Sequence, residues 1–583
     1  MAEFKMGVLT TKALSLISMA QAGKANITFT KFQIGSGNWG DSPTMATLQA
    51  ATGLKTKKGE FQITKIEYVN PATSKLTLVA SNLQNTTAGY YITEVGIFAK
   101  WTDGTEFLYA LYVTVNDKAD WFPAYNSITP SSITYSVPIT VANSSSVTVD
   151  AASAGIATQR DMEKAQADIA DIRGYIGFNE DDIYGTEVDF TNKKFARLAA
   201  AIGMAGGADF DKVKAFGGRR RCNLADDGTV NAYYGDEGYV EDGTNGQVMV
   251  EQPMFYYKVV PITLEKSGKG QITRKVRYYV SDTYHDGFKI HPAFIVDGKL
   301  CDKIYLSAFE ACIYDTSASK YDLLDAIAAD FAADKISSIA GAKPMSGNTN
   351  NLTRANTRKL AHNRGDGWEQ SIVQTVCASE LLMLVEYASF NMQAAIGDGV
   401  VSKPSGTGNE SEITGGSSSL GNKSGVVVNA NGQKIVSYRG EENPWSDIWT
   451  WFDGVNIKNP ATFAKGSFSD GVFVADHGFA DDTSADPYVE TGLYPPYFGW
   501  SYISAFCYSE KFDWMFLAGE TAGNSSLPVG DCSENSQPNW RVAILGACWG
   551  SGSAAGAFCW TLDDSSGSRN RSIGGRSVYR KAA

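Results

Sequence analysis

Residues 540–580 read WRVAILGACWGSGSAAGAFCWTLDDSSGSRNRSIGGRSVYR. Two kinds of residue are interleaved here, and they follow neither a helical nor a strand period. Aromatic, glycine and arginine residues, which we call the frame, are Trp540, Gly546, Trp549, Gly556, Phe558, Trp560, Gly574, Gly575, Arg576 and Tyr579. Small or polar residues, which we call the display positions, are Ala547, Cys548, Gly550, Ser551, Ser553, Ala554, Cys559, Asp563, Asp564, Ser565, Ser568 and Asn570. The pattern predicts a rigid scaffold that presents an adaptable binding surface.

This stretch closely resembles the C-type-lectin-like variable domains that phage retroelements diversify. The resemblance extends over residues 186 to 580, and it includes a helical pattern at 370–396 and YRGEENPWSDIWTWFDGVNI at 438–457. Both segments are similar to the formylglycine-generating-enzyme branch of the C-type lectin fold. The resemblance implies a variable region at 540–575, in which template adenines are rewritten while the body of the domain is kept. It also implies that the display positions contact a receptor.

Length and composition limit the classes of function that the chain can have. A chain of 583 residues is long enough for three or four domains. The net charge of −12 and the pI near 5.0 oppose nucleic-acid binding, which requires clustered basic residues. The one dense basic run, at residues 219–221, is followed by Asp226 and Asp227. We therefore expect it to form a solvated loop or packed salt bridges.

Residues 1–150 predict a β-rich domain with an opening helix. Apolar residues recur at helical spacing from Leu9 to Ala20, and Thr10 or Thr11 is a candidate cap. Strict alternation at 107–115 and 133–141 predicts half-buried antiparallel strands. IGSGNWG at 34–40 and GYYITEVGIFAKWTDGTEFLYALYV at 89–113 resemble the N-terminal domain of phage tail-collar fibre proteins. That resemblance implies attachment to the tail baseplate; a generic β sandwich is the alternative.

Residues 151–185 predict a linker and a short coiled-coil stalk. Its apolar seam repeats every seven residues, at Met162, Ala165, Ile169, Ile172 and Ile176. Two heptads are too short to be stable alone, so we expect them to bundle as a parallel homotrimer. A single amphipathic helix packed on the next domain is the alternative. With residues 186–583 as one loop-rich C-terminal domain, the expected fold class is a multidomain α+β protein.

The sequence offers no catalytic or metal-binding motif. Four histidines are widely separated, and no HExxH or GxSxG pattern occurs. Gln537, Pro538, Asn539 and Trp540 approach a calcium-binding lectin loop, but Arg541 stands where a ligand is required. We expect a turn there, and no metal or cofactor. Eight cysteines without CxxC spacing predict free thiols, and residues 402–425 predict a flexible polar surface insertion.

These observations favour a non-enzymatic phage tail fibre that is made in the host cytoplasm and carried on the virion. Its expected partners are baseplate proteins and a bacterial surface receptor, of protein or glycan nature, with no nucleic acid and no membrane insertion. The same parts suit a phage-tail-like bacteriocin or another contractile injection particle. A surface-polysaccharide depolymerase is a further alternative, which would require carboxylates such as Asp282, Asp286 and Glu310 to lie close together in the fold. A third alternative makes the C-terminal domain an oligomerisation cap.

Overall fold

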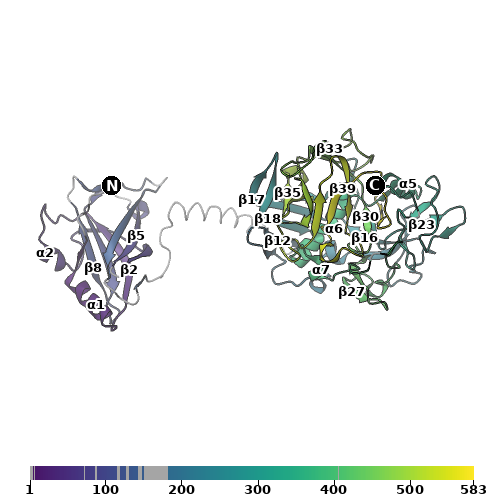
Figure 1. Cartoon of the computed structure of the whole chain (residues 1–583). Coiled ribbons are helices and arrows are strands. Elements are labelled where there is room, and N and C mark those ends of the chain that lie inside the picture. Colours follow the sequence, from purple (N-terminus) through teal and green to yellow (C-terminus); the bar gives the residue numbers. More distant parts are fainter. Residues whose placement is uncertain are drawn as a thin grey trace. The chain divides into compact units, whose positions relative to one another are not determined.

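The structure, a computed structural model, describes residues 4, 7–70, 73–85, 88–114, 118–126, 130–141, 147–149, 182–348, 350–404 and 406–582. The chain divides into two compact units, Met1–Gly174 and Tyr175–Ala583 (Figure 1). The residues predicted to form the stalk seam, Met162 to Ile176, lie outside the described ranges. Their heptad pattern therefore stays a prediction.

The N-terminal unit begins with the predicted helix. Helix α1 spans Thr11–Gln21, and the Thr10 hydroxyl caps it by accepting a hydrogen bond of 3.2 Å from the Ala13 amide. One face of α1 is buried against the strands and carries Ala13, Leu16, Ile17 and Ala20. A second short helix, α2, spans Met45–Gln49. The sequence pattern thus located α1 correctly and identified its cap.

In the residues that the structure describes, the strands of the N-terminal unit form three sheets. One has the order β1-β8-β7-β2-β11 with β3 on β2, another has the order β10-β5-β4, and the third pairs β6 with β9. Their bounds are Val8–Leu9 (β1), Ile27–Gly35 (β2), Lys57–Phe61 (β3), Ile63–Asn70 (β4), Thr73–Ser81 (β5), Tyr90–Ile92 (β6), Glu94–Lys100 (β7), Glu106–Val113 (β8), Asp120–Phe122 (β9), Ser132–Thr140 (β10) and Val147–Val149 (β11). Strand β10 is half-buried as expected, whereas β8 is buried on both faces from Phe107 onward because α1 also covers it.

Glu94 explains why the EVGIF and IGSGNWG segments occur together. Its buried carboxylate accepts hydrogen bonds from the amides of Gly37, Lys55 and Thr56, at 2.9, 2.9 and 2.8 Å. The indole of Trp39 donates a fourth bond of 2.6 Å. A buried charge is tolerated when its lone pairs are satisfied in this way. Glu94 therefore fixes the loop 34–40 and the loop before β3 onto strand β7.

The C-terminal unit is built mainly from three larger sheets. Their orders are β13-β12-β18-β17-β19 with β35 and β36, β15-β14-β16-β22-β41-β26, and β33-β32-β31-β38-β39-β37-β34 with β30 and β40. The first contains Ile183–Asp189 (β12), Lys194–Ala199 (β13), Tyr256–Ser267 (β17), Gly270–Ser281 (β18), Lys289–Ile290 (β19), Ala505–Tyr508 (β35) and Ala518–Glu520 (β36). The second contains Arg220–Leu224 (β14), Val230–Tyr233 (β15), Gln247–Pro253 (β16), Lys303–Ser307 (β22), Trp368–Gln370 (β26) and Ser577–Tyr579 (β41). The third contains Trp449–Trp451 (β30), Val455–Asn459 (β31), Gly471–Val474 (β32), Val489–Glu490 (β33), Phe498–Tyr502 (β34), Cys532–Asn535 (β37), Asn539–Leu545 (β38), Trp560–Asp564 (β39) and Ile573–Gly575 (β40).

Smaller sheets complete the unit. They comprise Ile295–Val296 (β20) with Lys299–Leu300 (β21), Cys312–Asp315 (β23) with Lys320–Tyr321 (β24) and Lys335–Ser337 (β25), and Gly425–Val428 (β27) with Lys434–Tyr438 (β28) and Glu441–Glu442 (β29). The DDG segment at 226–228 lies between β14 and β15, and the EDG segment at 241–243 lies between β15 and β16. The unit is therefore β-rich, with few helices.

The α-helices in the described part of this unit are α4 (Lys214–Gly217), α5 (Arg354–His362), α6 (Val373–Tyr387) and α7 (Met392–Ala395). A single helix was expected over 370–396, but α6 ends at Ala388, which has a left-handed backbone with φ of 49°. Side chains are buried on every side of α6 from Val373 to Glu386. Helix α6 is therefore a central core helix, beside which the chain turns into α7.

Two polar segments of the sequence are packed in the structure. Arg219 and Arg221 are buried and form ion pairs with Glu441 and Glu241, so the basic run at 219–221 is a set of packed salt bridges. The expectation that 402–425 is a flexible insertion too polar to pack is wrong. Hydrogen bonds satisfy its buried polar groups; for example, the Ser417 amide donates to Glu442 at 2.6 Å.

Candidate functional site

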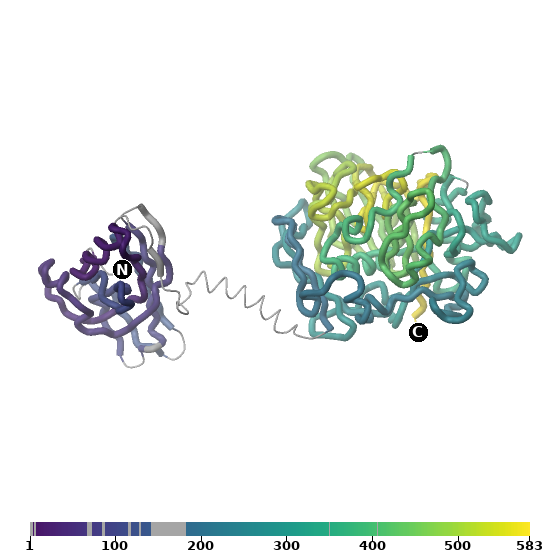
Figure 2. Tube along the Cα trace, turned by 90° about the horizontal axis from the view of Figure 1, so that it is seen from below, coloured from purple at the N-terminus to yellow at the C-terminus, as the bar shows by residue number. Residues whose placement is uncertain are grey.

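The stretch 540–575 forms the centre of one sheet. Strand β38 pairs with β31, β30 and β39, and β39 lies between β38 and β37. Strand β40 pairs in parallel with β30, and the chain then enters β41, which lies between β22 and β26 of another sheet. Figure 2 shows this yellow C-terminal segment among segments from earlier in the sequence. Both ends of the stretch are therefore held by strands.

Most frame residues are buried. Trp549, Phe558, Trp560, Arg576 and Tyr579 are between 0% and 7% exposed, and Gly546, Gly556, Gly574 and Gly575 are buried; Trp540 is half-buried against Phe473. The indole of Trp560 donates a hydrogen bond of 2.7 Å to Glu380 on α6 and packs on Phe452. Trp560 therefore anchors β39 to the central helix.

Glycine is required in the frame for two different reasons. Gly546 has φ of 95°, in the left-handed region that favours glycine, where the chain turns after β38. At Gly556, a Cβ atom would lie 2.1 Å from the carboxyl carbon of Asp531. Asp531 is fully buried and accepts a hydrogen bond of 2.9 Å from the Phe558 amide. The small residue at 556 thus lets a buried carboxyl hold the loop that precedes β39.

Arg576 closes the frame. Its guanidinium donates to the backbone carbonyls of Ser307 and Asn443, at 3.3 and 2.8 Å. Ser577 then donates its amide to the Ser307 hydroxyl at 2.9 Å. The buried carbonyls of Ser307 and Asn443 thereby accept hydrogen bonds, and β41 pairs with β22.

The display positions divide into two groups. Ala547, Ala554 and Cys559 are 0%, 8% and 0% exposed, and Ala547 and Cys559 pack in one apolar cluster with Val401. The sequence assigned them to the receptor-contact surface, but buried side chains are not available to a receptor, so we remove them from it. The rest are exposed or half-buried, and we call them the outer display positions: Cys548, Gly550, Ser551, Ser553, Asp563, Asp564, Ser565, Ser568 and Asn570.

Hydrogen bonds from distant segments hold the loop 565–572, which carries several outer display positions. The Gly347 amide donates to the Asn570 carbonyl at 3.0 Å, and Arg569 donates to the Asn351 side chain at 2.6 Å. Arg571 donates to the Gly408 carbonyl at 2.6 Å and lies over the ring of Trp549. The loop is therefore supported by Gly347, Asn351 and Gly408, a relation that spacing in the sequence did not indicate.

Acidic groups also lie on strands β37 and β39 of this sheet. Asp563 accepts hydrogen bonds from the amide and hydroxyl of Ser536, at 2.5 and 2.7 Å. Burial and the nearby Asp563 carboxylate raise the pKa of Glu534. Burial raises the pKa of Asp564.

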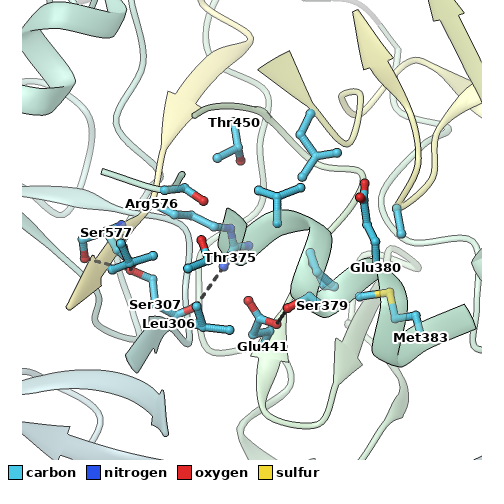
Figure 3. A pocket seen from close by; sticks show the side chains of 16 residues that line it. Leu306, Ser307, Thr375, Ser379, Glu380, Met383, Glu441, Thr450, Arg576 and Ser577 are labelled. Atoms are coloured by element: carbon cyan, nitrogen blue, oxygen red, sulfur yellow. Dashed lines mark hydrogen bonds between the residues drawn. The ribbon is translucent and has the colours of Figure 1, made fainter. Parts of the chain in front are cut away.

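A cavity of about 50 Å³ lies on the inner side of the sheet (Figure 3). It is lined partly by Thr375, Ser379 and Glu380 of α6 and by Leu545 and Ala557 near the frame. Ser379 donates to Glu441 at 3.2 Å across one wall. Buried side chains enclose it, and the volume suffices for ordered water. We assign the cavity to the polar packing behind the frame, away from the outer display positions.

The residues considered for metal and acid chemistry do not converge. Over the described ranges, no three His, Cys, Asp or Glu side chains are grouped so as to hold a metal ion. Asp282 accepts the amides of Lys214 and Ala215 at the start of α4, and Glu310 is fully buried beside Asp447, where burial raises its pKa. All eight cysteines are free, and only Cys548 among them is not buried. In the same described ranges, no helix combines the length and apolarity needed to cross a membrane.

A family model for the N-terminal part of phage tail-collar fibre proteins matches residues 1–160. The match covers the described part of the N-terminal unit. This match confirms the resemblance found in residues 1–150. A search of curated proteins found no match to the chain.

Solved structures similar to the chain include three variants named Major Tropism Determinant, each 11% identical in sequence. The U1 variant has a TM-score of 0.22 and covers 65% of this chain and 73% of its own. The P3c variant has a TM-score of 0.21 with coverages of 64% and 72%, and the M1 variant 0.22 with 67% and 77%. Since a TM-score near 0.2 does not establish a shared fold, the lectin-like assignment of the C-terminal unit stays a prediction.

Proposed function

We propose that this chain is a phage tail fibre whose C-terminal unit binds a bacterial surface receptor through the outer display positions. The family match of residues 1–160 supports the fibre part of the proposal. The observation that carries the receptor part is the separation of the stretch 540–575 into a mostly buried frame and a set of exposed small or polar side chains.

That separation has a physical consequence for recognition. Substitutions at surface positions away from special contacts usually change the free energy of unfolding by less than about 0.5 kcal/mol. Ser553, Ser565 and Asn570 are exposed, so their side chains can be replaced without disturbing the buried frame. A binding specificity that changes while the fold is kept requires this arrangement. From residue 550 onward, exposed or half-buried positions form two groups, 550–553 and 563–572, on either side of the buried run 554–562, so diversified codons could be confined to these two groups.

Attachment and assembly form the second part of the proposal. The collar domain would join the fibre to baseplate proteins of the virion, and the predicted stalk at 162–176 would hold three copies in parallel. Linked copies can gain about 10²- to 10⁴-fold in avidity without new contacts. A shallow surface of small side chains would then suffice for adhesion. The same architecture suits a bacteriocin-like or contractile injection particle.

We propose that adhesion is non-enzymatic. The depolymerase alternative needs two carboxyl groups facing a shared substrate space. Asp282 caps a helix and Glu310 is fully buried, so neither offers such a pair. No cofactor or metal has a role in the proposal. Soluble sugar released from cells by the purified chain would show that this part is incorrect.

The test uses the labelled full chain and the bacteria to which it adheres. Replacing Ser553 or Ser565 by Arg places a large cation among the outer display positions, and we expect adhesion to fall by about tenfold or more. Val428→Arg is the matched control, because it adds the same charge at a residue of β27 that is 62% exposed and outside the stretch 540–575. Equal adhesion by all three variants would contradict the proposal.

A further inference from the structure

Two tryptophans outside the stretch 540–575 lie together beside it. Trp500 on β34 is 41% exposed, and its ring contacts Trp449 on β30 at a centroid distance of 6.0 Å and an interplanar angle of 73°. Trp449 is half-buried and packs beside the cluster that contains Ala547 and Cys559. This edge-to-face contact holds the exposed indole of Trp500 in one orientation. Trp500 is thus a large, rigid apolar surface on the outer side of the sheet.

Hydrogen-bonding groups lie on the strand of Trp500 and on neighbouring segments. The Tyr502 hydroxyl and the Ser553 hydroxyl are 2.8 Å apart, and Ser553 is an outer display position. Glu534, on the neighbouring strand β37, follows Ser533, which pairs with Ser501 next to Trp500, and it lies near Asp563. The polar side chains that these strands carry near Trp500 are therefore hydroxyls and carboxyls. They suit a neutral ligand rich in hydroxyl groups and repel an anionic one.

We propose that Trp500 is a fixed contact that stacks on a neutral sugar ring of a cell-surface glycan, with the outer display positions selecting the groups around that ring. A pyranose presents an apolar C–H face, which an indole covers, and hydroxyl edges, which carboxylates and hydroxyls bind. The inference rests on the proposed function and names the chemistry of its receptor. It differs from calcium-dependent sugar binding because no metal takes part.

The position of Trp500 explains how binding would survive exchange of the display residues. Strand β34 adjoins β37, which adjoins β39, so Trp500 lies at the edge of the sheet that carries the stretch 540–575 without belonging to it. Stacking on an aromatic ring is tolerant of the ligand's substituents. Chains that differ at the display positions would then share the Trp500 contact, while the specificity of binding changes.

The experiment compares the full chain with its Trp500→Ala, Trp500→Phe and Tyr284→Ala variants on bacteria that the unchanged chain binds. Tyr284 is the matched control, since it is an aromatic residue that is 64% exposed and contacts Tyr256 of β17, outside this sheet. The cells are used untreated, after periodate oxidation, which cleaves vicinal diols of sugars, or after proteinase digestion. Near-ultraviolet circular dichroism and thermal unfolding check that each variant is folded.

We expect Trp500→Ala to lower adhesion by about tenfold or more, Trp500→Phe to keep part of it, and Tyr284→Ala to leave it unchanged. Periodate should abolish adhesion of the unchanged chain, and proteinase should spare it. Adhesion that resists periodate but is lost after proteinase would overturn the glycan inference and leave the proposed function standing. Undiminished adhesion by folded Trp500→Ala would also overturn it. If substitutions at the outer display positions have no effect while periodate and Trp500→Ala do, the proposed function fails and the glycan contact stands.

Discussion

Gly556→Ala tests the buried frame most sharply. The new Cβ would lie 2.1 Å from the Asp531 carboxyl carbon, whereas ordinary contacts begin at 3.4 Å, so the carboxyl must move by about 1.3 Å. That movement breaks the hydrogen bond of 2.9 Å from the Phe558 amide. Overpacking costs about 1–3 kcal/mol, and a buried donor left unpaired costs about 1–3 kcal/mol. We expect the free energy of unfolding to fall by about 3 kcal/mol.

Urea unfolding followed by tryptophan fluorescence measures this loss, because nine of the 12 tryptophans lie between residues 368 and 560. Ser553→Ala, at an exposed position three residues away, is the control and should change stability by less than about 0.5 kcal/mol. Repeating Gly556→Ala in an Asp531→Ala background removes the clash, so the added cost there should fall below about 1 kcal/mol. Equal costs in both backgrounds, or a loss no larger than that of Ser553→Ala, would refute the reasoning.

Three other predictions concern the rest of the chain. Glu94→Ala should destabilise the N-terminal unit by about 3 kcal/mol or more, because four donors lose their acceptor. Hydrogen exchange of the Gly37 and Thr56 amides should become faster, while exchange in the C-terminal unit should not change. Burial lowers the pKa of His291 to about 3, below its ordinary value near 6.5, so unfolding takes up a proton between these pH values. The free energy of unfolding should therefore fall by about 1.4 kcal/mol per pH unit as the pH drops below about 6.5. In urea titrations at pH 7 and 5, the stability of a His291→Gln variant should depend less steeply on pH, and identical slopes would contradict the assignment. The full chain should have a trimeric mass by light scattering at micromolar concentration, and replacing Ile169 and Ile172 by Asp should weaken the trimer; a monomeric mass would exclude the predicted stalk.

Much of the fold was predictable from local patterns. The helix from Thr11 and the strands at 106–113 and 132–140 each occur where periodicity indicated. The family match at residues 1–160 agrees with two short motifs that Glu94 physically links. Helix α6 was predicted too long, because its apolar pattern continues past Ala388, where the backbone conformation changes.

The candidate site was less predictable. Ala547, Ala554 and Cys559 resemble display residues by type, but small side chains also fill close-packed interiors, and sequence cannot distinguish the two uses. Trp449 and Trp500 were missed because they lie more than 35 residues before the stretch, and only strand pairing brings them beside it. An exposed tryptophan has no sequence signal that separates it from a buried one. The polar segment 402–425 was misread for a related reason, since its partners Glu442 and Arg571 come from other segments.

The central claim is that the outer display positions decide which cells are bound while the frame keeps the fold. The most direct measurement exchanges all nine outer display positions at once for those of a sister variant and measures adsorption of the particle to both hosts, together with the unfolding temperature of the purified chain. We predict that adsorption moves to the sister's host and that the unfolding temperature changes by no more than a few degrees. Adsorption that stays with the original host, in a chain that is still folded, would contradict the account.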